Sequence, residues 1–300
     1  MAFLNILASS KKDPSDLPPA YQCRKEVLPT LRERFEKSGY QYGKSDEIQL
    51  SIKGLKVTFG GIVAVNFIDI GVRKGDVHAI IGPNGAGKTS VLNAINGIYK
   101  AESGEIIFEG KNILGMKPHD IVLRERIGRT FQRLALFPTM SVIDNIMVSR
   151  HHFLKSGLIG CGVYLGRANR EEILNQRIVE EIIDFLEIEH VRHKNTGELG
   201  YGLQKRVEIG RALALEPRLL LLDESVSGMN LEEKEDVARF IMDIREELGI
   251  TMVIIEHEMD MVMELADQIT VMNFGEKIAE GIPSEIVRNP KVIEAYLGAK

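Results

Sequence analysis

Eight consecutive residues have the types and spacing of a phosphate-binding loop. They are Gly82, Pro83, Asn84, Gly85, Ala86, Gly87, Lys88 and Thr89, which match the pattern G-x-x-x-x-G-K-[ST]. Glycines let backbone N–H groups turn inward around phosphate oxygens, and a helix that starts in the loop adds the positive end of its dipole. Lys88 would add a full positive charge, and the Thr89 hydroxyl would ligate Mg2+. Ser90, the next residue, is also expected to bind the nucleotide. The motif predicts a site for nucleotide phosphates and Mg2+.

Asp223 and Glu224 directly follow the run Leu219–Leu222. A buried strand would display such acids at its end, where parallel sheets bind their ligands. Asp223 suits the coordination shell of Mg2+. Glu224 could hold or deprotonate a water molecule for in-line attack on the γ-phosphorus. The pair predicts hydrolysis of the bound nucleotide.

Gln132 and His257 are the remaining candidates for catalysis. Gln132 follows Arg129-Thr130-Phe131 and could sense Mg2+ and water through its amide. His257 lies just beyond the apolar run Met252–Ile255 and could hydrogen-bond the γ-phosphate. Neither residue indicates catalysis alone, because a histidine at a strand end is more often structural or solvated. The phosphate loop and the acidic pair make both of them candidates.

The apolar pattern supplies elements that could position these residues. β-rich runs before the loop cover Ile52–Phe59, Ala64–Val72 and Val77–Ile81. After the loop, apolar residues repeat at helical spacing at Val91, Ala94, Ile95 and Ile98. The sequence therefore predicts a strand, a glycine-rich turn and a helix, which is the context that the loop requires.

The later part of the chain alternates compact strands with helices. From about Leu114 to Asn195 the pattern is mostly helical, and three apolar runs then appear at Leu219–Leu222, Met252–Ile255 and Ile269–Met272. Strands that alternate with helices predict an α/β fold with a mostly parallel, buried sheet.

Composition limits the classes of function. The chain has 300 residues, of which 44% are hydrophobic and 27% charged, and its formal net charge is -5. An acidic balance argues against a nucleic-acid partner. Cys23 and Cys161 lie far apart, and no apolar run approaches the roughly 20 residues of a spanning helix. The two distant cysteines argue against a disulfide scaffold or a zinc module, and a reducing cytoplasm fits best. We also identify no secretion signal.

Residues 1–48 have a different texture from the rest. The stretch mixes Pro14, Pro18, Pro19 and Pro29 with many charges. A short helix around Glu26–Lys37 is conceivable because Val27, Leu31 and Phe35 are spaced by four. We favour a solvated N-terminal extension and assign it no function.

Together these motifs resemble those of the ATP-binding-cassette (ABC) family, over about Gln49–Leu297. The segment Leu199–Ile209 is similar to the family's signature, which opens a helix. Two subunits of that family pair head to tail, and each signature completes the other's nucleotide site. The resemblance implies that Gly200, Tyr201 and Gly202 contact a partner's ATP. Phe59 resembles the aromatic residue that stacks on adenine, and Asn230 belongs to a segment that resembles the loop between the two sites.

The same resemblance implies the domain organisation. We expect a P-loop NTPase of ABC ATPase type over residues 49–300, with a mostly parallel core sheet, an antiparallel β subdomain and a helical subdomain inserted at about 114–216. The segment from Gln132 through Leu134–Asn145 would form the hinge side of a groove for a permease helix. Residues Arg150–Asn169 would form the outer wall of that groove.

Three features resemble the branched-chain amino-acid importer subgroup. They are the Tyr201-Gly202 form of the signature, the long Arg150–Asn169 insertion, and the ending "NPKVIEAYLG". The resemblance implies two membrane permease subunits, a second ATPase subunit that is the same or a different chain, and a periplasmic substrate-binding protein as an indirect partner. It places the chain at the cytoplasmic face of the inner membrane, as a peripheral subunit.

Two residues depart from the family pattern. Gly200 stands where a serine is common, and Ser225 replaces the usual proline after the catalytic glutamate. With Gly200, the hydroxyl contact to the γ-phosphate is absent. One alternative function is therefore a regulatory ATP-binding module with little turnover. Two further functions stay open: the ATPase of a urea importer or lipopolysaccharide exporter, and a non-transport cassette acting on DNA or ribosomes.

Overall fold

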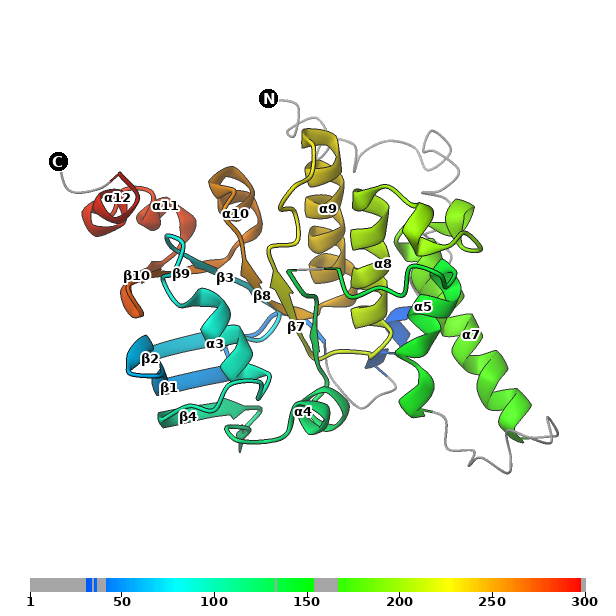
Figure 1. Cartoon of the computed structure of the whole chain (residues 1–300), viewed down its shortest axis with the longest axis horizontal. Helices are drawn as coiled ribbons and strands as arrows, with labels where there is room; N and C mark the ends of the chain where they lie inside the picture. Colours follow the sequence, from blue (N-terminus) through cyan, green and yellow to red (C-terminus); the bar gives the residue numbers. More distant parts are fainter. Residues whose placement is uncertain (1–30, 34, 37–41, 133, 154–166, 298–300) are drawn as a thin grey trace.

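The structure, a computed structural model, describes residues 31–33, 35–36, 42–132, 134–153 and 167–297. Figure 1 shows two sheets side by side, with a group of helices (α5, α7 and α8) at the opposite end of the molecule from strands β1, β2 and β4. The predicted α/β architecture, with a mostly parallel core sheet, an antiparallel sheet and helices, is confirmed.

The core sheet has the strand order β10-β9-β3-β8-β7-β6. Its strands are β3 (Val77–Ile81), β6 (Ile127–Arg129), β7 (Leu219–Asp223), β8 (Thr251–Ile255), β9 (Gln268–Asn273) and β10 (Glu276–Gly281). Strands β9, β3, β8, β7 and β6 pair in parallel, whereas β10 is antiparallel to β9. The three apolar runs predicted after residue 195 are all strands of this sheet.

Both faces of the core sheet are buried. Successive side chains of a strand point to opposite faces. Leu220 and Leu222 of β7 therefore join one hydrophobic cluster beneath the helices, and Leu219 and Leu221 join another, against the antiparallel sheet. This explains why the strands read as continuous apolar runs. The sheet is a rigid base for the polar residues at its strand ends.

The second sheet is antiparallel and has the order β2-β1-β4-β5. Its strands are β1 (Ile48–Phe59), β2 (Ile62–Arg73), β4 (Ser103–Phe108) and β5 (Lys111–Asn112). Between β3 and β4 lies α3 (Lys88–Ile95), which buries Val91, Leu92, Ala94 and Ile95. The sheet and α3 share the second hydrophobic cluster, so the start of α3 is held between the two sheets.

Helices and helical turns make up most of the remaining described chain. The helices are α4 (Pro118–Arg124), α5 (Val142–Val148), α7 (Arg167–Phe185), α8 (Tyr201–Leu213), α9 (Leu231–Asp243), α10 (Met259–Leu265), α11 (Pro283–Ile286) and α12 (Pro290–Leu297). Short turns are η3 (His151–Phe153), η4 (Glu189–Val191), η5 (Thr196–Glu198) and η6 (Ile244–Leu248). Within the described ranges, none of these helices combines the length and the apolar character needed to span a membrane.

Strand β6 was not predicted, although the middle of the chain is otherwise mostly helical where it is described. The stretch Leu114–Asn195 was expected to be mostly helical, but Ile127–Arg129 pairs with β7 and extends the core sheet. Three residues are too few to show the alternation of apolar and polar residues that is typical of a strand. Such a strand cannot be distinguished from the helical patterns on either side of it. Its position matters because it places Arg129 beside the end of β7.

The described part of the N-terminal stretch, residues 31–33, 35–36 and 42–48, packs against the core, which corrects the expectation of a solvated tail for this part alone. Residues 1–30 lie outside the described residues, so the expectation for them stays a prediction. Leu31 and Phe35 are each 1% exposed and belong to the larger hydrophobic cluster. Tyr42 packs edge-on against Phe35, and the Gly43 N–H donates to the Gly249 carbonyl. Lys44 pairs with Asp76 and Asp267, which directly precede strands β3 and β9. The spacing of Leu31 and Phe35 was therefore the informative signal.

Candidate nucleotide site

Glycines shape the turn between β3 and α3. Gly82, Gly85 and Gly87 have φ of 150°, 81° and 98°, a region that L-residues with a Cβ rarely adopt. A Cβ on Gly82 would lie 2.0 Å from the Met272 carbonyl oxygen, and one on Gly87 would lie 2.2 Å from that of Ala64. The loop is thus wedged between the two sheets. Only glycine permits this path, at the start of a helix whose dipole favours an anion.

Lys88 lies inside this turn. Its Nζ donates to the carbonyl oxygens of Gly82 (2.8 Å) and Pro83 (3.0 Å). Burial lowers the pKa of Lys88 from its ordinary value, while the negative charges of Glu224 and Asp223 raise it again. The structure therefore brings the loop lysine within electrostatic range of both predicted acids, 135 or more positions later in the chain.

Asp223 ends β7 and is almost fully buried. Its Oδ2 accepts a hydrogen bond from Arg129 Nη2 (2.8 Å), while its Oδ1 is buried and has no hydrogen-bond partner among the described residues. Asp223 lines a cavity of about 480 Å³ together with Thr89 and Gln132. Mg2+ takes oxygen ligands and needs only one or two carboxylates beside nucleotide phosphates. The predicted metal ligands, with one oxygen of Asp223 still free, fit that ion.

The structure joins the three predicted catalytic residues. Gln132 Nε2 donates to Glu224 Oε2 (2.7 Å), and His257 Nε2 lies 2.8 Å from Glu224 Oε1. Glu224 has φ of 50°, a strained value for a residue with a Cβ. Its N–H donates to the Ile255 carbonyl (2.9 Å), which fixes this conformation. Gln132, Glu224 and His257 follow the ends of β6, β7 and β8, which are neighbouring parallel strands.

Helix α8 holds the segment before Gln132. The Phe131 N–H donates to Glu208 Oε1 (3.1 Å), and Lys205 Nζ donates to the Phe131 carbonyl (3.1 Å). Lys205 and Glu208 also pair with each other (3.0 Å), at 1% and 5% side-chain exposure. A displacement of α8 would therefore move the Gln132 segment with it.

Glu256 anchors the turn after Glu224. The Ser225 N–H donates to Glu256 Oε1 (2.6 Å). A proline at position 225 could not make this bond, because it has no N–H. Burial raises the pKa of Glu256 to about 7; Glu224 adds to this rise, and backbone hydrogen bonds from Ser225 and Val226, with the charge of Lys205, oppose it. Ser225 therefore lacks the rigid backbone of a proline, but its N–H holds the turn by a hydrogen bond to a buried carboxyl group.

This pKa makes folding stability depend on pH. Between pH 4.5, the ordinary pKa, and about 7, the folded protein keeps a proton on Glu256 that the unfolded chain has lost. The free energy of unfolding should then fall as pH rises through this window, by about 3 kcal/mol, and level off above it. Glu256→Gln should remove this dependence in urea denaturation at pH 5 and 7.5. An exposed control, Glu258→Gln, should retain it, and an unchanged dependence in Glu256→Gln would contradict the assignment.

Phe59 ends β1 and is 42% exposed. Its ring packs edge-on against Tyr99, with centroids 4.7 Å apart. Hairpin β1–β2 also carries Ala64, whose carbonyl touches the phosphate loop. The exposed Phe59 ring, supported by the partly buried Tyr99, fits the expected role in stacking on a base. Tyr99 was not predicted, because no motif or periodic pattern marks it.

The signature residues lie apart from this chain's own loop. Gly200 is the N-cap of α8, which Tyr201 and Gly202 begin, and in Figure 1 α3 and α8 lie on either side of β7 and β8. Asn230 caps α9 in a capping box with Glu233, whose Oε1 also accepts from the Gly202 N–H (3.3 Å). These residues do not line the described cavities that contain the phosphate loop or Asp223. Their predicted contact with nucleotide is therefore not formed in either of these described cavities.

Sequence reasoning missed Arg129 and Glu256. Arg129 was seen only as a neighbour of Gln132, because the strand that positions it was not predicted. Glu256 was overlooked beside His257, although an acidic residue directly after a buried strand is the signal that identified Asp223.

Known proteins resemble this chain in sequence and in fold. A family model described as "ABC transporter" matches residues 65–227, and one described as "Branched-chain amino acid ATP-binding cassette transporter" matches residues 276–300. BraF of Pseudomonas aeruginosa, a high-affinity branched-chain amino acid transport ATP-binding protein, is 37% identical over 250 residues, which cover 83% of this chain and 97% of BraF. LivG of Escherichia coli strain K12, with the same description, is 38% identical over 253 residues at the same coverage.

A solved structure shares the fold. The ADP conformation of MJ1267, an ATP-binding cassette of an ABC transporter, superposes with a TM-score of 0.73 at 32% identity, covering 84% of this chain and all of MJ1267. The matches account for nearly the full length of these relatives. The chain therefore belongs to the ABC transporter family, as an ATP-binding subunit that hydrolyses ATP.

Proposed function

We propose that the chain energises import of branched-chain amino acids by hydrolysing Mg2+-ATP at the site formed by the phosphate loop, Asp223 and Glu224. The observation that carries the catalytic part is the contact of Gln132 and His257 with the two oxygens of Glu224. The names of BraF and LivG and the match of residues 276–300 support the substrate class.

Each side chain has a role in this mechanism. Backbone N–H groups of the loop and Lys88 bind the β- and γ-phosphates, and Phe59 stacks on the base. Glu224 orients the attacking water and accepts its proton, while Gln132 and His257 fix the direction of the carboxylate. Thr89 and Asp223 would hold Mg2+, and the bound ion would supply positive charge that stabilises the developing negative charge of the triphosphate. Gln132 reaches the same cavity and could contact that shell.

We propose a head-to-tail pair of ATPase subunits. Gly200 and Tyr201 stand exposed at the start of α8, and the helix dipole there favours a phosphate. Glu233 ties Asn230 to Gly202 through two backbone N–H groups. A phosphate bound at the signature of one subunit would thereby affect the position of the Asn230 turn through Glu233. The pair would work at the cytoplasmic face of the membrane with two permeases, and a periplasmic binding protein would supply the substrate.

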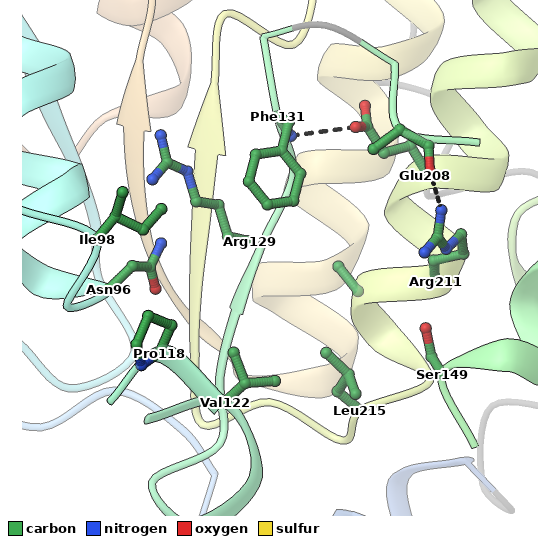
Figure 2. Close-up of a pocket in the computed structure, with 12 residues that line it drawn as sticks. Asn96, Ile98, Pro118, Val122, Arg129, Phe131, Ser149, Glu208, Arg211 and Leu215 are labelled. Atoms are coloured by element: carbon green, nitrogen blue, oxygen red, sulfur yellow. Dashed lines mark hydrogen bonds between the residues drawn. The ribbon is translucent and has the colours of Figure 1, made fainter. Parts of the chain in front are cut away.

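A groove next to the site is the proposed seat of a permease helix. Figure 2 shows it between Asn96, Ile98, Pro118 and Val122 on one side and Arg211 and Leu215 of the α8 region on the other. Ala135 contributes from the predicted hinge segment. Arg150, expected at the outer wall, is instead buried and bonded to Asn175, Ala214 and Glu216. Residues 154–166 of that expected wall lie outside the described residues.

Phe137 lies beside this groove, against Arg211 of its lining, and tests the proposed docking surface. It is 46% exposed and its ring lies 5.6 Å from the guanidinium carbon of Arg211. Phe137→Asp should weaken co-purification with the permeases at least tenfold, because it removes apolar area and adds a charge. A similar change at Leu136, which is partly buried against the core, should act in the same direction. An exposed aromatic outside the groove, Phe67→Asp, is the matched control. Undiminished association of Phe137→Asp would contradict the groove assignment.

The substrate class is tested with the assembled transporter in proteoliposomes. Leucine, isoleucine or valine on the binding protein should stimulate ATP hydrolysis and accumulate inside, whereas urea should do neither. Stimulation by urea alone would exclude the proposed substrate while leaving the ATPase assignment intact.

A further inference from the structure

Arg129 connects three elements of the site. It ends β6 and donates from Nη2 to Asp223 Oδ2 on β7 (2.8 Å) and from Nη1 to Asn93 Oδ1 on α3 (2.6 Å). The side chains of Arg129 and Asp223 are 5% and 1% exposed. Removing one partner of such a pair leaves a buried charge, so the pair is strongly held. One guanidinium thus links the helix that the phosphate loop opens to the carboxylate proposed to hold Mg2+.

The same side chain lines two cavities. The first, of about 480 Å³, contains Thr89, Asp223 and Gln132. The second, of about 210 Å³, is the groove in Figure 2, where Arg129 and Phe131 are drawn side by side. Phe131 also lines both cavities, and its ring centre lies 5.3 Å from the guanidinium carbon of Arg129. Arg129 and Phe131 are therefore a common wall of the site and the groove.

We propose that Arg129 is a positioning residue whose guanidinium binds the same carboxylate, Asp223, as the nucleotide-bound cation. Through this shared carboxylate, binding of the cation changes the position of Arg129 in the groove wall. A cation on the same carboxylate repels the guanidinium and weakens its hold on Asp223 Oδ2. The guanidinium then moves relative to Phe131, which alters the groove wall. This inference rests on the proposed binding of Mg2+-ATP.

A tryptophan in place of Phe131 would report this movement. The chain contains no tryptophan, so Phe131→Trp places a single tryptophan beside Arg129, and its emission can be excited selectively over that of the tyrosines. ATP is added first with EDTA, and excess Mg2+ follows. Emission should change on addition of Mg2+, and Arg129→Gln in the same background should reduce that change at least fivefold. An equal Mg2+-dependent change in both proteins would overturn the proposal.

Cation affinity gives a second readout that needs no turnover. Arg129→Gln should raise the Mg2+ affinity of the ATP-bound protein on the order of three- to tenfold, because a positive charge near the ion is removed. Mg2+ titration with a fluorescent ATP analogue measures it. Arg126→Gln is the matched control, since Arg126 immediately precedes β6 and pairs with Glu216 (2.7 Å), at 23% and 13% exposure. Unchanged or weaker affinity in Arg129→Gln would contradict the proposed competition.

A conservative variant covers the case in which Arg129→Gln does not fold. Arg129→Lys keeps the positive charge, so its Mg2+ affinity should stay within about twofold of that of the unmodified chain. The Mg2+-dependent tryptophan signal should also persist, and its loss would overturn the inference. The two proposals fail differently. If the unmodified chain does not bind Mg2+-ATP, the proposed function is wrong. If the unmodified chain, Arg126→Gln and Arg129→Gln all bind Mg2+-ATP with the same Mg2+ affinity, only the present inference is wrong.

Discussion

Glu224→Gln should reduce ATP turnover by roughly 10²- to 10⁴-fold, the range that a general base contributes, while the affinity for ATP stays within a few-fold. Glutamine has the same shape and can still accept from His257 through its amide oxygen, but it cannot take a proton from water. The carboxylate it replaces is held from both sides by Gln132 and His257. The change should therefore affect kcat and leave ATP binding almost intact.

Phosphate release under saturating ATP measures kcat, and equilibrium binding of a fluorescent ATP analogue measures affinity. Glu232→Gln, on the exposed first turn of α9, removes the same charge without touching the site and should turn over normally. A turnover rate insensitive to Glu224→Gln would favour a regulatory module, the hypothesis that Gly200 kept open.

Lys88→Ala should weaken ATP binding about 100-fold or more, which corresponds to about 2.7 kcal/mol. The ammonium group is buried in the turn and directed by the carbonyls of Gly82 and Pro83, so its charge-assisted bonds to phosphate are made at little entropic cost. Its removal also leaves Asp223 and Glu224 to repel the triphosphate with less compensation.

The dissociation constant of a fluorescent ATP analogue, measured by polarisation, tests this expectation. Lys53→Ala, on the exposed face of β1, is the control for loss of a positive charge. Affinity in Lys88→Ala within threefold of the unmodified chain would mean that phosphate is bound elsewhere.

Much of the site could be predicted from the sequence because it is encoded locally. The phosphate loop is contiguous, and the acidic pair is marked by the buried strand that precedes it. Gln132 and His257 could be connected to them because parallel strands end at the same edge of a sheet. The structure brings all of these residues together within hydrogen-bonding or electrostatic range.

Other features depend on contacts between segments far apart in sequence. Arg129 and Asp223 are 94 positions apart and meet only because β6 is paired with β7, and β6 is too short to show a periodic pattern. The buried position of Phe35 was masked by neighbouring prolines and charges. The proposed roles of the signature and Asn230 depend on a contact between two chains, because their proposed ligand belongs to another subunit's site.

Hydrogen exchange of the Glu224→Gln variant, with and without Mg2+-ATP, tests the central claim most directly because the proposed ligands of the phosphates are backbone N–H groups. Peptides covering residues 82–90 should exchange at least tenfold more slowly when nucleotide is bound, and peptides covering 219–226 should also be protected. Protein that binds ATP yet shows unchanged exchange at residues 82–90 would contradict the account.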